Sequence, residues 1–394
     1  MNELAHCKII DIADFSHPAL LPHLRNIASG EMRRFGLSEP VIIADSKQWE
    51  CAMMLRTLSE VGILRPRALL AGIGAGTEDT TYALAAQGCI VFPCDRYLEQ
   101  TPWSDVAPAG MMVRPAQYSQ FDYPTGAVIP VHTDARALSL PSDFFDGVYS
   151  AGSIEHFGSL DAVAAAAEEI GRVLKPGGVA VLTTEFRLGG PNDRPWFSDD
   201  CILFTPEMLY EHIVEPSGLT LIGEPNFATS QQTFDNRVVL SEFLEKAKKV
   251  ETLTDKRNAY PNLVLFHAGY LFCSVHLALR KTGSPEPTRR TRSVRFRDGV
   301  AADSTRVSGI LTAQITEWTL DYGTRPGHEM ISNSALEARV QTAEAALARL
   351  QQSRSMRLTR PLRESAHIVR TTPGLREAAR FIMRILRKIK GTVG

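Results

Sequence analysis

The chain has 394 residues, of which 44% are hydrophobic and 22% charged, and its formal net charge is −1. This length predicts two or three folded units, and the apolar fraction excludes wholesale disorder and a collagen-like chain. No apolar run reaches the roughly 18–20 residues that a membrane-spanning helix needs, and the first residues lack the basic-then-apolar pattern of a secretory signal. We therefore expect neither in this sequence.

Cysteine usage indicates the redox environment. The six cysteines are scattered along the chain and include no Cys-x-x-Cys pair. We therefore expect no disulfide framework and no metal site, and a reducing, cytoplasmic location fits best.

The secondary-structure pattern changes near residue 65. Before it, residues 1–64 are expected to be a helical lead-in, in which Trp49 either belongs to the core of a helix over 46–64, our preferred interpretation, or covers a bound cation. After it, the expected strands are residues 67–72, 89–94, 127–132, 145–150, 179–184, 219–223 and 264–279, and the expected helices are residues 78–87, 160–174 and 206–217. This alternation predicts a parallel sheet covered on both faces that closes near residue 282.

A glycine-rich loop follows the first of these strands. Gly72, Gly74 and Gly76 lie between the strand and a helix, where glycine allows a tight turn and close approach of a ligand. Asp95 ends the next strand, where a carboxylate can accept hydrogen bonds from both hydroxyls of a ribose. In this context the loop indicates a nucleotide-type site.

Two later stretches make the pattern more specific. Residues 133–141 (TDARALSLP) precede 144–150 (FFDGVYS), and residues 171–178 read GRVLKPGG. Together with the loop and Asp95, they resemble the class I S-adenosylmethionine-dependent methyltransferases, well over residues 65–185 and loosely over 185–282. The resemblance implies a Rossmann-like, mostly parallel seven-stranded sheet with helices on both faces. It also implies that Gly72, Gly74 and Gly76 line the methionine end of S-adenosylmethionine, that Asp95 holds the ribose, and that Asp134 and Ala135 contact the adenine.

The sequence departs from that family at one position. The family usually has an acidic residue two positions before the first glycine, where this chain has Leu70. Glu78 lies just after the loop. It can replace that acid at the cofactor's amino end, or its negative charge can simply stabilise the N-terminus of the following helix.

Candidates for the catalytic base follow the fourth and fifth expected strands. His156 is of a residue type that commonly serves as a general base and lies where open α/β sheets present their ligands, and Glu185 ends the fifth strand. We interpret His132 as structural. Residues 188–204 are long, aromatic and rich in Gly and Pro, and we expect them to form a lid over the acceptor.

The C-terminal region has a different charge from the body. Residues 353–394 carry eleven Lys and Arg against two acids, a charge of +9, which leaves −10 for the rest. A linker or unassigned segment is expected over 283–333, followed within 334–394 by a short coiled-coil seam and a basic amphipathic helix over 375–390. The seam residues, suited to homo- or hetero-oligomers, are Leu336, Val340, Ala343, Leu347 and Leu350. The basic helix suits an anionic membrane surface or a partner's groove; with Phe381 as its one aromatic residue, we expect no nucleic-acid binding.

The tail supports a second resemblance. Residues 353–363 (SRSMRLTRPLR), after the seam, are similar to the tails of many bacterial surface-polysaccharide enzymes. The overall prediction is a methyltransferase that O-methylates a sugar of such a polysaccharide or of its lipid-linked precursor, in the cytoplasm or at the inner face of the cytoplasmic membrane. The alternatives are a small-molecule methyltransferase, or a catalytically weak scaffold that recruits glycan enzymes.

Overall fold

A computed structural model describes residues 3–99, 101–191, 196–198 and 201–283. The expected linker, coiled-coil seam and basic helix lie outside the described residues, and the expected lid over 188–204 lies partly outside them.

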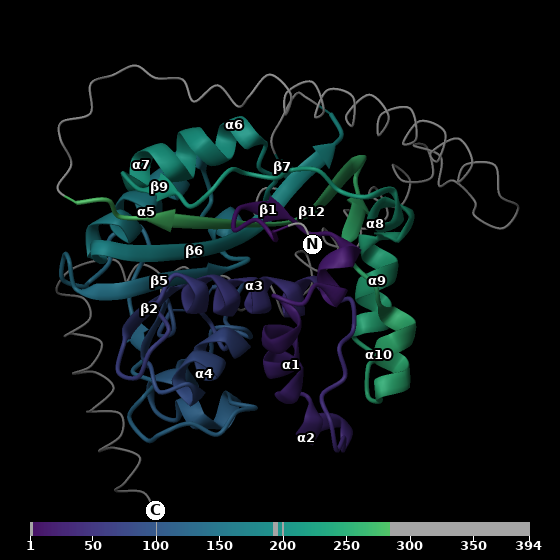
Figure 1. Cartoon of the computed structure of the whole chain (residues 1–394), viewed down its shortest axis with the longest axis horizontal. Coiled ribbons are helices and arrows are strands. Elements are labelled where there is room, and N and C mark those ends of the chain that lie inside the picture. Colours follow the sequence, from purple (N-terminus) through teal and green to yellow (C-terminus); the bar gives the residue numbers. More distant parts are fainter. Residues whose placement is uncertain (1–2, 100, 192–195, 199–200, 284–394) are drawn as a thin grey trace, which may run out of the picture. The chain divides into compact units, whose positions relative to one another are not determined.

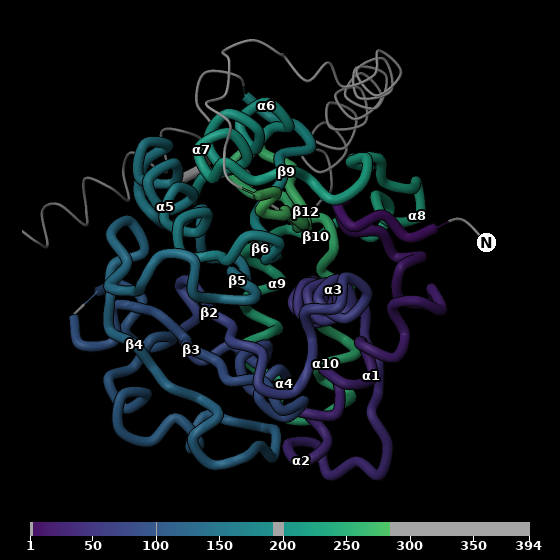
Figure 2. The backbone as a smooth tube through the Cα atoms, turned by 60° about the vertical axis from the view of Figure 1, so that its left-hand side comes forward, coloured from purple at the N-terminus to yellow at the C-terminus, as the bar shows by residue number. Residues whose placement is uncertain are grey.

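One ten-stranded sheet organises the described chain (Figure 1). Along its main path the order is β10 (Arg237–Val239), β11 (Val264–His267), β12 (Tyr270–Arg280), β6 (Leu174–Gly189), β5 (Phe145–Ala151), β2 (Leu69–Ile73), β3 (Ile90–Asp95) and β4 (Val131–His132). The short strands β1 (Lys8–Ile9) and β9 (Thr220–Leu221) pair with β12 off this path. Figure 2 follows the sheet from β4 to β12. The pairs from β4 to β6 are parallel, and β12 is antiparallel to its neighbours, so a mostly parallel Rossmann-like sheet is confirmed.

Three details of the sheet differ from the expectation. It has ten strands rather than seven, because β1 and β10 are too short to show a strand pattern in the sequence and because residues 264–279 form parts of two strands, β11 and β12. Over 264–279, where at least one long strand is expected, the chain forms a hairpin, in which Ala268 and Gly269 turn with φ of 48° and 84° inside an otherwise apolar run. The expected strand over 127–132 shrinks to β4, with one isolated bridge from Val128 to Val91.

Helices cover both faces of the sheet. The helices α5 (Leu160–Val173), α6 (Pro206–Leu209) and α7 (Glu215–Ser217) lie on one face, and α1 (Leu21–Ser29), α3 (Ser46–Glu60) and α4 (Asp79–Ala86) lie on the other (Figure 1). The short helices α8 (Gln231–Asp235), α9 (Leu240–Ala247) and α10 (Leu253–Ala259) lie nearer the ends of the strands, and α2 (Met32–Phe35) follows α1 on its far side from the sheet. A π-helical turn over Tyr210–Val214 joins α6 to α7, so the helix expected over 206–217 is present as one continuous stretch. No helix within the described part of the chain is long and apolar enough to span a bilayer.

A buried polar contact joins the N-terminal strand to α3. The indole of Trp49 is fully buried, and its Nε1 donates a 2.8 Å hydrogen bond to Asp14 Oδ2. The ammonium group of Lys8, also buried, forms an ion pair with the same carboxylate. Trp49 therefore belongs to the helix core, as preferred from its sequence.

We expect Asp14→Asn to destabilise the protein by about 3–5 kcal/mol, because it leaves the buried Lys8 charge without its partner. Urea unfolding of the variant measures this loss. The control is Asp122→Asn, which removes an exposed ion pair with Arg33 and should cost no more than about 1 kcal/mol. Equal losses in the two variants would contradict the assigned importance of the Lys8–Asp14 pair.

Candidate functional site

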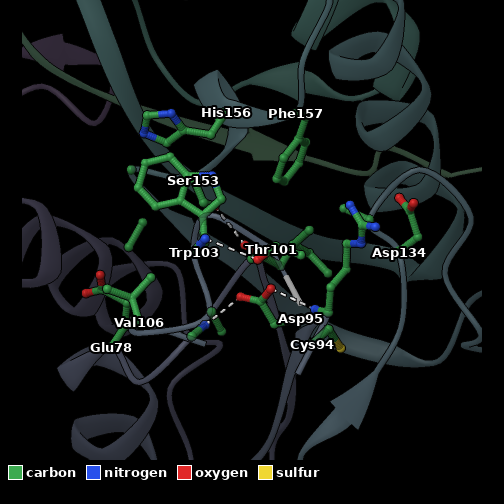
Figure 3. Close-up of a pocket in the computed structure, with 18 of the residues that line it drawn as sticks. Glu78, Cys94, Asp95, Thr101, Trp103, Val106, Asp134, Ser153, His156 and Phe157 are labelled. Atoms are coloured by element: carbon green, nitrogen blue, oxygen red, sulfur yellow. Dashed lines mark hydrogen bonds between the residues drawn. The ribbon is translucent and has the colours of Figure 1, made fainter. Parts of the chain in front are cut away.

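A cavity of about 700 Å³ lies at the carboxyl ends of β2, β3 and β5. β2 pairs with β3 on one side and with β5 on the other. The chain therefore adds β3 and β4 on one side of β2 and then crosses to add β5 on its other side, which makes this a switch point in the strand order. Open α/β sheets bind ligands at such switch points. The lining comes from residues 73–79, 94–96, 101–103, 106, 133–136, 138, 151–153 and 156–158 (Figure 3).

The turn after β2 brings backbone, rather than side chains, to the cavity wall. Gly74 and Gly76 line the cavity with φ of 62° and 45°. A Cβ on Gly74 would lie 2.6 Å from Ser153 Oγ, and one on Gly76 would lie 2.6 Å from the carbonyl oxygen of Val106. The wall therefore has room only for glycine at these two positions.

Gly72 is not among the residues that line the cavity. It lies within β2, where a Cβ would come within 2.3 Å of the Tyr149 hydroxyl oxygen. Its role is close packing against the buried Tyr149 ring, because residues inside a strand do not face the loop end. Leu70, in the same strand, is fully buried.

Asp95 is held at the centre of the cavity wall. Its Oδ2 accepts a 2.9 Å hydrogen bond from the Gly76 N–H, and its Oδ1 accepts a 2.7 Å bond from the Arg96 N–H. Burial raises the pKa of Asp95, and these two backbone hydrogen bonds lower it. In the view of Figure 3, Asp95 lies between Glu78 on one side and Asp134 on the other.

Asp134 lies on the cavity wall with Ala135. The Arg136 guanidinium donates to both of its oxygens, at 2.9 and 2.6 Å, which holds the pKa of Asp134 at about 2. The carboxylate is therefore ionised throughout the neutral range and keeps a fixed orientation.

His156 reaches the cavity from a short 3-10 helix, Ile154–His156, after β5. Its ring lies against that of Trp103, with 4.3 Å between centroids (Figure 3). The Nε2 atom is 3.9 Å from Oε1 of the buried Glu155, whose other oxygen accepts a 2.8 Å hydrogen bond from Thr184 Oγ1. Burial raises the pKa of Glu155, and His156 opposes this.

The other catalytic candidate, Glu185, is not among the residues that line this cavity. Its Oε2 is buried with no hydrogen-bond partner among the described residues, and burial, assisted by the nearby Glu155 and Glu50, raises its pKa to about 8. His132 also lies off the cavity, where its Nδ1 accepts a 3.3 Å hydrogen bond from the Leu98 N–H.

Sequence reasoning missed the segment between β3 and β4. Trp103 and Val106 from this segment line the cavity, and Trp103 keeps 39% of its surface exposed. The available signal was a tryptophan directly after Thr101 and Pro102, because a large aromatic residue in a turn often serves a binding site.

We expect Gly76→Ala to destabilise the protein by at least about 1 kcal/mol more than Gly36→Ala, because its Cβ collides with the Val106 carbonyl. Gly36 is the matched control, since it has a similar φ of 63° and no atom within 4 Å of its would-be Cβ. Urea unfolding compares the two variants, and equal costs would contradict the close approach.

Part of the chain is similar to known proteins. Residues 71–182 match the family model described as "Methyltransferase domain", and no curated protein matches the chain. Among solved structures, the chain is similar to 1,6-didemethyltoxoflavin-N1-methyltransferase of Burkholderia thailandensis, with 17% identity, a TM-score of 0.36, and coverage of 60% of this chain and 78% of that one. It is also similar to phosphoethanolamine N-methyltransferase 2 of Haemonchus contortus, with 18% identity, a TM-score of 0.40, and coverage of 58% and 52%. The chain therefore contains, over residues 71–182, a segment that matches a methyltransferase domain.

Proposed function

We propose that the cavity binds S-adenosylmethionine with its ribose at Asp95 and its adenine at Asp134 and Ala135. The support is chemical fit. Two glycines leave a backbone cradle that a Cβ would fill, and the Asp95 carboxylate, oriented by backbone N–H groups, has lone pairs left for ribose hydroxyls. The volume of about 700 Å³ suits a ligand of nucleoside size.

The reaction that this site supports best is methyl transfer to a hydroxyl group, with His156 as the general base. When bound, S-adenosylmethionine would supply an electrophilic methyl group: the acceptor oxygen would bond to this methyl as the sulfur–methyl bond breaks, and the electron pair of that bond would stay on sulfur, which gives S-adenosylhomocysteine as the leaving group. The acceptor proton passes to the imidazole of His156. The observation that carries this assignment is the position of His156 on the cavity wall, with its ring held by Trp103.

Glu155 has a supporting part in this proposal. Its buried carboxylate lies 3.9 Å from His156 Nε2, so an ionised Glu155 favours the imidazolium that forms when His156 accepts the proton. Trp103 limits the orientations of the imidazole and excludes water from one side of it.

We expect His156→Ala to lower kcat by about 10²–10⁴-fold, the usual contribution of a general base. Because His156 makes no direct contribution to the proposed ribose and adenine contacts, the Kd for S-adenosylhomocysteine should change little. Single-turnover methyl transfer and calorimetry measure the two quantities. His212→Ala, which removes a histidine of the π-helical turn that does not line the cavity, is the control and should keep its turnover. Full turnover by His156→Ala would exclude His156 as the base.

The acceptor that we propose is a sugar hydroxyl of a bacterial surface polysaccharide or of its lipid-linked precursor. Its support is the sequence of the tail, where residues 353–363 resemble those of polysaccharide enzymes and residues 375–390 combine basic and apolar side chains. Such a segment would hold the enzyme near an anionic membrane surface, where lipid-linked sugars are assembled.

Transfer of labelled methyl to a panel of acceptors tests this choice. The panel contains polysaccharide fractions, lipid-linked sugars in anionic vesicles, and small hydroxyl compounds. We expect glycan labelling by the full chain, and weaker labelling of the vesicle-bound acceptor by a chain truncated after residue 352. Labelling of small compounds alone would favour the small-molecule alternative, and cofactor binding without any transfer would favour the scaffold.

A further inference from the structure

The N-terminal helix α3 brings an ion pair to one end of the cavity. Lys47 Nζ lies 2.8 Å from Glu50 Oε2, and the Glu50 side chain is only 6% exposed. Ser274 Oγ donates a 2.6 Å hydrogen bond to Glu50 Oε1, and Thr183 Oγ1 donates a 3.2 Å bond to Oε2. The sheet strands β12 and β6 therefore fix Glu50, which in turn fixes Lys47.

Glu78 adds a second carboxylate to this pair. It lines the cavity, keeps 26% of its side chain exposed, and places Oε1 3.8 Å from Lys47 Nζ. This distance exceeds that of a hydrogen bond, so Glu78 is attracted by the charge of Lys47 and keeps its acceptor capacity. Burial raises the pKa of Glu78, and Lys47 opposes that rise.

The same group reaches the cavity wall at Gly152. A Cβ on this glycine, which lines the cavity, would lie 2.8 Å from Lys47 Nζ and 3.4 Å from Glu50 Oε2. The Lys47 side chain is 45% exposed. Two carboxylates and one ammonium group thus lie beside this part of the wall, where the absence of a side chain on Gly152 lets the Lys47 ammonium group approach the cavity.

We propose that Glu78 accepts a hydrogen bond from the α-ammonium group of S-adenosylmethionine and that Lys47 pairs with its α-carboxylate. An amino-acid zwitterion beside a lysine–glutamate pair places each charge next to one of opposite sign. The excess of one carboxylate in the cluster matches the net positive charge of this cofactor. The inference rests on the proposed cofactor site. It adds to that site the helix α3, which lies outside the segment 71–182 that matches the methyltransferase domain.

The position of Glu78 suits this assignment. In Figure 3 its carboxylate lies on the opposite side of Asp95 from Asp134, where the amino-acid end of the cofactor must be if its adenine is at Asp134. Leu70 has no part in the contact, since it is fully buried in the core.

Calorimetry on the full chain with two ligands tests the proposal. S-adenosylhomocysteine carries the amino-acid end, and 5′-methylthioadenosine has the same nucleoside thioether without it. We expect Glu78→Gln and Lys47→Gln each to raise the Kd of S-adenosylhomocysteine about 10–100-fold, which is the effect of losing a charged hydrogen bond. The Kd of 5′-methylthioadenosine should change by less than about threefold in both variants.

The matched control is Asp95→Asn, which should weaken the binding of both ligands by a similar factor because both contain the ribose. Retained binding of 5′-methylthioadenosine also reports that each variant is folded. If Glu78→Gln weakens both ligands equally, or neither, the assignment of Glu78 is wrong. A wild-type chain that binds 5′-methylthioadenosine and S-adenosylhomocysteine equally well overturns this inference but leaves the nucleoside site standing. A wild-type chain that binds neither ligand overturns the cofactor site and this inference with it.

Discussion

The pairing of β12 is the constraint on which the rest of the structure depends. Its eleven residues are almost entirely buried, and it pairs with β6, β11, β1 and β9. A strand buried on both faces must satisfy its backbone groups through neighbouring strands, so β12 draws the N-terminal segment and the C-terminal half of the sheet together. It also carries Ser274, which orients Glu50 beneath the cavity. The same strand therefore supports both the core and one end of the site.

The site itself is built by backbone geometry and by charges placed at the strand ends. The switch in strand order beside β2 leaves space at the strand ends, where Gly74 and Gly76 line the cavity. Asp95 is oriented there by peptide N–H groups rather than by flexible side chains. Groups oriented in advance cost little to order when a ligand binds. Different charged groups lie on the two sides of Asp95. Asp134, which pairs with Arg136, lies on one side, and Glu78, which lies near Lys47, lies on the other (Figure 3).

Several cavity residues were accessible from the sequence because they occupy fixed positions relative to strand ends. Gly74, Gly76, Asp95, Asp134 and His156 all follow strands whose hydrophobic runs are easily recognised, and all of them line the cavity. Gly72 and Glu185 also lie in or at the end of such strands but do not line it. A difference of one or two residues along a strand decides whether a residue faces the loop end or the neighbouring elements, and a linear pattern does not resolve that difference.

The sequence by itself determined the alternation of strands and helices, the glycine turn and the acid after the second strand, because these depend on local periodicity and on short spacing. Only the tertiary structure decided which distant segments complete the cavity. The Trp103 ring packs against that of His156, 53 residues further along the chain, and Lys47 approaches Glu78 from helix α3, which precedes β2. Such contacts depend on the order in which strands pair and on how helices cover them. Those arrangements are properties of the whole packed chain rather than of any local pattern.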